Sequence, residues 1–197
     1  MIKNAPLIAV LLLAGVIAFT PRVISLFETP QPNLPILGKA PSFELTKADG
    51  SKFASSSLAG KWHVVNFFFA SCPHVCPAVN GRVSLVHKEF AKKGIEFVSI
   101  SVDPETDTPA ALTEYWPRFT ESDEHWHFLT HNGMEDPMKG LAAVLEQGYF
   151  LPISEDKNNH TTRLVLIDPE GQIRGYYRGL SDNGSEELAE VLSTLTS

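Results

Sequence analysis

The sequence contains few cysteines and few cations. Only two cysteines occur in 197 residues, so a metal ion bound through both of them would need a further ligand from His, Met or an acid. Sixteen Lys and Arg residues stand against 23 Asp and Glu residues, which gives a formal net charge of -7. Because the cations are scattered, the chain lacks the basic patch that a nucleic acid requires, and we expect no nucleic-acid partner.

The chain also lacks internal repeats and low-complexity tracts, and its length fits a single domain. A chain of 197 residues with 43% hydrophobic content can bury a sizeable core, but it is too short for two ordinary domains. We therefore expect one globular unit.

One long apolar run lies near the amino end. Residues 5–19 (APLIAVLLLAGVIAF) carry no charge. An uncleaved signal anchor, a cleaved signal peptide and a buried helix are the three interpretations, since the run falls short of the usual spanning length of about 20 residues. We favour the anchor, within residues 1–22, because the best candidate cleavage site, Val16-Ile17-Ala18, fits the small-x-small pattern poorly.

This segment also predicts where the protein resides. No Arg- and Ser-rich transit peptide precedes it, which favours a bacterial envelope over an organelle. We expect a single-pass protein of the bacterial inner membrane, attached through residues 5–27, with its domain facing the periplasm. Cleavage would instead release the domain into the periplasm. Residues 23–37 belong to a Pro-rich stretch that predicts a semi-extended linker, and the folded domain is expected over 38–197.

Hydrophobic periodicity predicts alternating strands and helices in this domain. Two nearly continuous apolar runs, 62–70 and 95–103, are typical of strands buried on both faces. Further strands are expected in a hairpin about Asp49-Gly50, at 125–130, and in a second hairpin of 162–168 with 172–177. Helical spacing and caps predict helices over 77–94, from Thr108 and Pro109 onward, over 136–147 and over 185–195. The pattern predicts an α/β, thioredoxin-like sandwich with a mixed central sheet and flanking helices, preceded by the membrane segment.

The two cysteines, Cys72 and Cys76, lie at the junction between a buried strand and a helix. Pro73 suits a first helical position, and Cys76 would then lie one turn after Cys72 on the same face. The amides of a helix amino end favour thiolates, which raises both nucleophilicity and metal affinity. A structural disulfide, two buried apolar thiols, a cycling dithiol and disulfide, and a thiophilic metal site all remain open.

Several histidines are candidates for a third ligand. His74 lies between the cysteines but projects to the opposite side of a helix. His160 lies in a polar loop that runs into the strand at 162–168, so it can reach the sheet edge that holds the thiols. His125 and His127 alternate along a strand, and we interpret them as solvated edge positions rather than as a metal pair.

The remaining candidates have simpler explanations. Asp103 and Asp107 in SVDPETDTP could lie near the thiols, although an Asp-Pro turn and helix capping explain both residues. Three other histidines form no constellation with the rest: His63, His87 and His131.

Four stretches in this order, FFFASCPHVCP, VSISVDPETDTP, WHFLT and NHTTRLVLIDPEGQIRGYY, resemble the Sco (SenC/PrrC) family of membrane-anchored copper proteins that assist cytochrome c oxidase assembly. The resemblance covers about residues 38–195. It implies that Cys72, Cys76 and His160 bind one copper ion, as Cu(I) or Cu(II). It also implies partners: the copper-bearing subunit of a cytochrome oxidase and other copper carriers. One departure is His74, since the family commonly carries Asp between the two cysteines.

Two functions of different classes follow from these residues. The first is a metallochaperone that binds and transfers copper without turnover. The second is an enzyme, a thiol-disulfide reductase that acts on cysteines of an oxidase subunit or of another envelope protein. Thioredoxin-type enzymes usually place a cis-proline before the strand at 162–168, and NNHTTRLV has none, which favours the metallochaperone.

Overall fold

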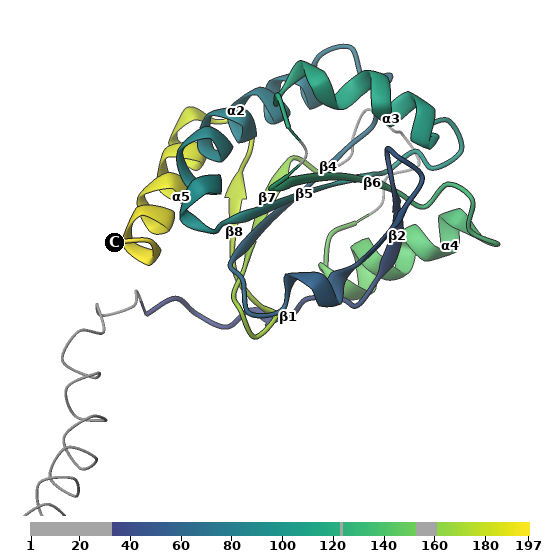
Figure 1. Cartoon of the computed structure of the whole chain (residues 1–197). Helices are drawn as coiled ribbons and strands as arrows, with labels where there is room; N and C mark the ends of the chain where they lie inside the picture. The colour runs from purple at the N-terminus through teal and green to yellow at the C-terminus, as the bar shows by residue number, and fades with distance from the viewer. Residues whose placement is uncertain (1–32, 123, 153–160) are drawn as a thin grey trace, which may run out of the picture. The chain divides into compact units, whose positions relative to one another are not determined.

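A mixed sheet forms the centre of this computed structural model (Figure 1). The structure describes residues 33–122, 124–152 and 161–197, and Leu34–Thr196 make one compact unit. Within the described residues the sheet has eight strands in the order β1-β8-β7-β4-β5-β6-β2-β3. The strands are β1 (Gly38–Lys39), β2 (Glu44–Lys47), β3 (Lys52–Ala54), β4 (His63–Phe68), β5 (Glu96–Ser101), β6 (Trp126–Thr130), β7 (Arg163–Ile167) and β8 (Gln172–Arg178).

The centre of the sheet is parallel and buried. Strands β4, β5 and β6 run parallel, whereas β7 pairs antiparallel with β4. Every residue of β4 and β5 is buried, which confirms the strands predicted from the apolar runs at 62–70 and 95–103. The carboxyl ends of β4, β5 and β6 therefore share one edge of the sheet, and the chain enters β7 at that same edge.

Helices cover both faces of this sheet. The helices are α2 (Val75–Phe90), α3 (Pro109–Tyr115), α4 (Pro137–Ala142) and α5 (Asp182–Leu195). Short 3-10 turns occupy Ser55–Leu58, Ala91–Lys93 and Trp116–Arg118, and a π-helical turn, Ala143–Gly148, continues α4. Figure 1 shows α2, α3 and α5 on one face and α4 on the other. This is the predicted α/β arrangement of a mixed sheet between flanking helices.

Local signals in the sequence fix most helix boundaries. Thr108 caps α3 as predicted, since its Oγ1 accepts a hydrogen bond from the amide of Ala111 over 3.2 Å. Gly94, with a φ of 87°, ends the turn that follows α2. The last helix begins earlier than the predicted residue 185, because Ser181 accepts a hydrogen bond from the Gly184 amide over 3.1 Å and caps α5.

Both predicted hairpins form. Gly50 adopts a φ of 82° in the turn between β2 and β3, and Gly171 adopts a φ of 77° in the turn between β7 and β8. Only glycine reaches this left-handed region without steric cost. The two hairpins place β3 at one margin of the sheet and β8 next to β1 at the other.

The sheet separates two hydrophobic cores. Alternate residues of β4 face opposite sides, so Val64 and Phe68 pack with α2, α3 and α5, while Val65 and Phe67 pack with α4. Both cysteines belong to the first core. The thiols and α4 therefore lie on opposite faces of the sheet.

The predicted membrane segment within residues 1–22 lies outside the described residues. In the part of the chain that the structure does describe, no helix is both long and apolar enough to span a bilayer. The described part of the expected linker lies alongside β8. The Leu37 amide donates to the Ile173 carbonyl over 2.8 Å, and Arg174 donates to the carbonyls of Leu34 and Pro35.

Candidate metal centre

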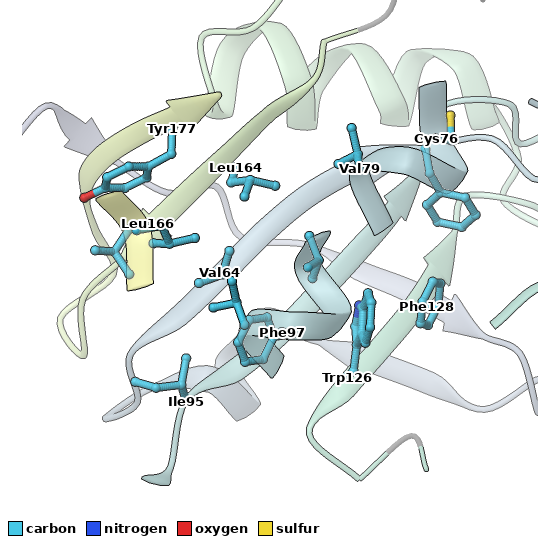
Figure 2. Close-up of a cluster of buried hydrophobic side chains, with 14 of the residues drawn as sticks. Val64, Cys76, Val79, Ile95, Phe97, Trp126, Phe128, Leu164, Leu166 and Tyr177 are labelled. Atoms are coloured by element: carbon cyan, nitrogen blue, oxygen red, sulfur yellow. The ribbon is translucent and has the colours of Figure 1, made fainter. Parts of the chain in front are cut away.

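Cys72 and Cys76 lie close together at the amino end of α2, just beyond the carboxyl end of β4. Their residues are 7% and 0% exposed, and both are thiols in this structure. Figure 2 shows Cys76 at the end of a hydrophobic cluster, beyond Val79 of the same helix. The junction position predicted for the pair is therefore the one observed.

The start of the helix differs from the prediction. Helix α2 begins at Val75, and His74 is its N-cap residue with a non-helical φ of -135°, so Pro73 is not a first helical residue. Cys72 consequently lies outside the helix rather than one turn below Cys76 on its face. The Cys76 amide donates a hydrogen bond to Cys72 Sγ over 3.2 Å, which means that the sulfur itself satisfies a helix amino-terminal amide.

Hydrogen bonding lowers the pKa of the Cys72 thiol. Burial by itself would raise this pKa, but the Cys76 amide, the Cys76 thiol and the amides of His74 and Val75 stabilise the thiolate and outweigh burial. Amides at a helix amino end have this effect because they carry partial positive charge. Cys72 is therefore the more acidic and more nucleophilic thiol of the pair.

The pKa of Cys76 moves in the opposite direction. Burial raises it, and the nearby sulfur of Cys72 and carboxylate of Asp107 raise it further. The Phe69 amide donates to Cys76 Sγ over 3.4 Å and opposes only part of this change. The pair therefore combines one thiol that ionises more easily than an ordinary cysteine with one that keeps its proton at neutral pH.

Asp107 holds the segment that leads to the cysteines. Its carboxylate is buried and accepts hydrogen bonds from the Ala70 amide, at 3.1 and 3.2 Å, and from Ser101 Oγ, at 2.6 Å. The prediction that capping explains Asp107 is wrong, because the cap of α3 is Thr108. Asp103 does support a turn as expected, since its Oδ2 accepts from Thr106 Oγ1 over 2.6 Å.

A buried polar chain that the sequence did not reveal leads from the sheet to this site. Asn66 donates to Asn80 over 2.7 Å, and Asn80 donates to the Tyr115 hydroxyl over 3.1 Å. Burial raises the pKa of Tyr115, and the two nearby cysteine sulfurs add to the effect. A polar Asn80 on the buried side of α2 was the available signal, since a buried amide needs hydrogen-bond partners.

The predicted third ligand, His160, lies outside the described residues. Within residues 33–122, 124–152 and 161–197, no three His, Cys, Asp or Glu side chains are grouped so that they could hold a metal ion. His74 is exposed at the N-cap of α2, so it is not a helical residue and the predicted projection to the opposite side of a helix does not apply to it. Two thiols are thus the donors that this part of the chain offers at the site.

The interpretation of His127 as a solvated edge residue is wrong. Strand β6 lies between β5 and β2, and the His127 side chain is only 13% exposed. Its Nε2 lies 3.1 Å from Glu96 Oε2, and His125 Nδ1 lies 3.4 Å from Glu96 Oε1. Lys61 completes the ion-pair group with its Nζ 2.8 Å from Glu96 Oε1. These two histidines therefore contact the buried carboxylate of Glu96 on the neighbouring strand β5.

The other three histidines do not join the thiols. His63 is buried at the start of β4, where burial lowers its pKa and its Nδ1 lies 3.1 Å from the Lys61 carbonyl. Burial also lowers the pKa of His87, which packs on the rings of Phe97 and Trp126. His131 follows β6 and is 1% exposed. A cavity of about 540 Å³ also lies away from the thiols, since His63 at the amino end of β4 lines it.

A thioredoxin-like α/β domain with a cysteine pair at a helix amino end is the class that this fold and site define. The sequence profile of the SCO1/SenC family matches residues 37–197, so the chain belongs to this family. A SCO1 protein homolog of Bacillus subtilis is 26% identical over 161 residues, which cover 78% of this chain and 81% of the relative.

Solved structures show the same relationship. A SCO1/SenC family lipoprotein from Bacillus anthracis has a TM-score of 0.73 and 27% identity, with 83% of this chain and 98% of that chain covered. ScoI of Bradyrhizobium japonicum, solved with copper bound, has a TM-score of 0.62 and 29% identity, with coverage of 79% and 98%.

Proposed function

We propose that this chain binds one copper ion through Cys72, Cys76 and His160. The observation that carries the proposal is the hydrogen bond between the two cysteines at the start of α2, where the Cys76 amide donates to Cys72 Sγ over 3.2 Å. Two thiolates and an imidazole are donors that copper(I) favours. The copper-bound ScoI structure supports the same ion, since that protein is similar to this chain over nearly all of its own length.

The described residues next to His160 support its part in the site. The chain enters β7 at the edge of the sheet where β4 ends, because Val65 pairs with Val165 in antiparallel register. Thr162 accepts a hydrogen bond from the Gly179 amide over 2.9 Å, and a Cβ added to Gly179 would lie 2.6 Å from the Thr162 oxygen and 3.1 Å from Val79. Val79 is less than one turn from Cys76 on α2, so Thr162, two positions after His160 in the sequence, lies near the helix that carries Cys76.

We infer that the bound copper is cargo for a respiratory oxidase. The Sco family is described as one of cytochrome c oxidase assembly proteins. The copper-bearing oxidase subunit would then be the recipient, and other copper carriers would supply the ion. In this proposal the chain is anchored in a bacterial inner membrane through residues 5–27 with its domain in the periplasm. The alternative is a periplasmic domain released by cleavage.

A thiol-disulfide reductase is the second candidate function. The opposite pKa shifts of the two thiols favour it, because Cys72 can attack a partner disulfide while the protonated Cys76 resolves the mixed disulfide. Attack by the Cys72 thiolate releases one partner thiolate. The Cys76 sulfur, once deprotonated, then displaces the second and leaves a Cys72–Cys76 disulfide. The partner disulfide gains two electrons and the pair loses two.

An anaerobic copper(I) titration of the full chain against a competing chelator tests the first function. We expect one tightly bound ion in the wild type, binding at least tenfold weaker in His160→Ala, and no change in His74→Ala, the matched exposed histidine beside the thiols. Tight binding that is indifferent to His160 would overturn the ligand set. Weak binding in all three forms, with dithiol oxidation intact, would favour the reductase.

A further inference from the structure

His131 is a buried imidazole whose ring nitrogens form no hydrogen bond within the usual distance and angle limits. The residue is 1% exposed, and neither Nδ1 nor Nε2 forms a hydrogen bond to another described residue. Burial lowers its pKa to about 4, and a polar interaction with the Gly140 backbone, which lies outside the usual hydrogen-bond limits, offsets only part of that shift. A neutral imidazole carries one acceptor lone pair, and burying that lone pair without a partner is destabilising. A structure that retains such a group calls for an explanation.

A tight turn brings a thioether next to this ring. The Met134 amide donates to the His131 carbonyl over 3.1 Å, and Gly133 adopts a φ of 82° at the third position of the turn. The ends of such a turn lie within about 7 Å of each other. The sequence His-Asn-Gly-Met therefore folds Met134 back toward His131.

Gly140 of α4 has no side chain, and the side chains of His131 and Met134 both lie next to the position that a Cβ would occupy there. A Cβ placed on Gly140 would lie 3.0 Å from His131 Cδ2 and 3.6 Å from Met134 Sδ. Both atoms thus border the same point on α4. Cδ2 and Sδ therefore lie near each other beside α4, and Nε2 is the ring nitrogen that is bonded to Cδ2.

We propose that His131 Nε2 and Met134 Sδ form a second binding site, for a soft monovalent metal ion such as copper(I). Thioether sulfur selects copper(I), and imidazole suits the same ion. The site lies after β6 and against α4, on the face of the sheet opposite the thiols. The proposal rests on these donors alone and does not depend on copper at Cys72 and Cys76.

The surroundings provide access and charge balance. Met134 is 37% exposed, and a flexible methionine can swing aside to admit an ion to the buried nitrogen. Both donors are neutral, so the site would carry the charge of the ion. The adjacent carboxylates of Glu135 and Asp136 are exposed, and their negative charges are opposite in sign to that of the ion. Two protein donors leave the ion open on its solvent side, which suits exchange rather than storage.

Met138 offers a matched control. It is 43% exposed and lies in the first turn of α4, two residues before Gly140. Two residues along a helix correspond to about 200° of rotation, so Met138 projects away from the face that Gly140 presents to His131. Apart from Met1, the chain has only these two methionines.

The test is an anaerobic copper(I) titration of the full chain carrying Cys72→Ser and Cys76→Ser, against a competing chelator. We expect one ion per chain, at least tenfold weaker binding when Met134→Leu is added, and no change with Met138→Leu. In ¹⁵N-histidine NMR spectra, copper(I) should shift a ring nitrogen of His131 and leave that of His63 in place.

The experiment distinguishes a loss of copper binding at His131 and Met134 from a loss of copper binding at the thiols. In the chain with both cysteines we expect the tightly bound ion at the thiols and a second, weaker ion that Met134→Leu removes, so a folding defect of the double serine variant does not remove the test. A cysteine-free chain that folds and binds no copper(I) would overturn the proposal. So would equal effects of Met134→Leu and Met138→Leu.

Discussion

The amide of Cys76 donates a hydrogen bond to the sulfur of Cys72 over 3.2 Å, so the sulfur of one cysteine satisfies an amide in the first turn of the helix that contains the other. This contact makes the two thiols chemically unequal. It lowers the pKa of Cys72, which receives further amides, whereas burial raises that of Cys76. The inequality is useful for either proposed function, because both require one thiolate that forms easily.

The first prediction concerns the order in which the thiols ionise. In Cys76→Ser, the remaining Cys72 should react with iodoacetamide with a midpoint below the ordinary thiol pKa of about 8.5. In Cys72→Ser, the remaining Cys76 should react only at higher pH. Alkylation rates measured between pH 5 and 10 check this. Equal midpoints in the two variants would contradict the proposed asymmetry.

Asp107 gives the second prediction. Replacing it with Asn removes the charge that strengthens the hydrogen bonds from Ala70 and Ser101, which should lower the free energy of unfolding by about 1 to 2 kcal/mol. The pKa of Cys76 should fall, because the negative charge of Asp107 raises it. Urea unfolding and thiol titration are the measurements.

Asp182→Asn is the matched control for this experiment. The Asp182 side chain is 81% exposed, and its ion pair with Arg82 should contribute less than about 1 kcal/mol. A stability loss of the same size in both variants, or an unchanged Cys76 titration in Asp107→Asn, would show that Asp107 does not position the cysteine segment.

Much of the fold was predictable because its determinants are local. The apolar runs of β4 and β5, the cap at Thr108 and the glycines of the two hairpins each act within a few residues of their own position. The site was less predictable. The start of α2 at Val75 depends on the sulfur of Cys72, and the role of Asp107 depends on Ala70, 37 residues earlier. Periodicity carries no information about such pairings.

His127 shows the same limit. Alternation along 125–130 correctly indicated a strand, yet it could not show that the neighbouring strand supplies Glu96. A carboxylate at the start of a buried strand was a signal in the sequence, since such a charge needs partners. His160 is a different case: the resemblance assigned it to the copper site, and its place there stays a prediction.

Glu96 gives the third prediction, which concerns acid stability. Burial raises its pKa, but hydrogen bonds from His127 and Lys61 outweigh burial and lower the pKa to about 2. Because the folded pKa lies below the unfolded value of about 4.3, the stabilisation is complete above the unfolded value. It is lost as the pH falls through about 2. The corresponding free energy is about 3 kcal/mol.

Glu96→Gln should therefore be less stable than the wild type at pH 7, and the difference should shrink toward pH 2. Urea unfolding at pH 7, 5, 4 and 3 is the measurement. Glu89→Gln is the control, because Glu89 is exposed on α2 and should leave the profile unchanged. A gap between Glu96→Gln and the wild type that is constant with pH would contradict the assignment of this acid dependence to Glu96.

The last prediction links the raised pKa of Cys76 to copper binding. A bound ion requires both sulfurs as thiolates, and Cys76 keeps its proton at neutral pH, so binding must release that proton. The copper(I) association constant of the full chain should then fall about tenfold for each pH unit between 8 and 6 on account of Cys76. Cys72 adds less, because its pKa is already lowered. Asp107→Asn should raise the association constant at each pH and leave this slope unchanged, since it lowers the pKa of Cys76 without bringing it into this pH range. Titration calorimetry in buffers of different ionisation enthalpy counts the protons directly, and an association constant that is independent of pH would exclude Cys76 as a ligand.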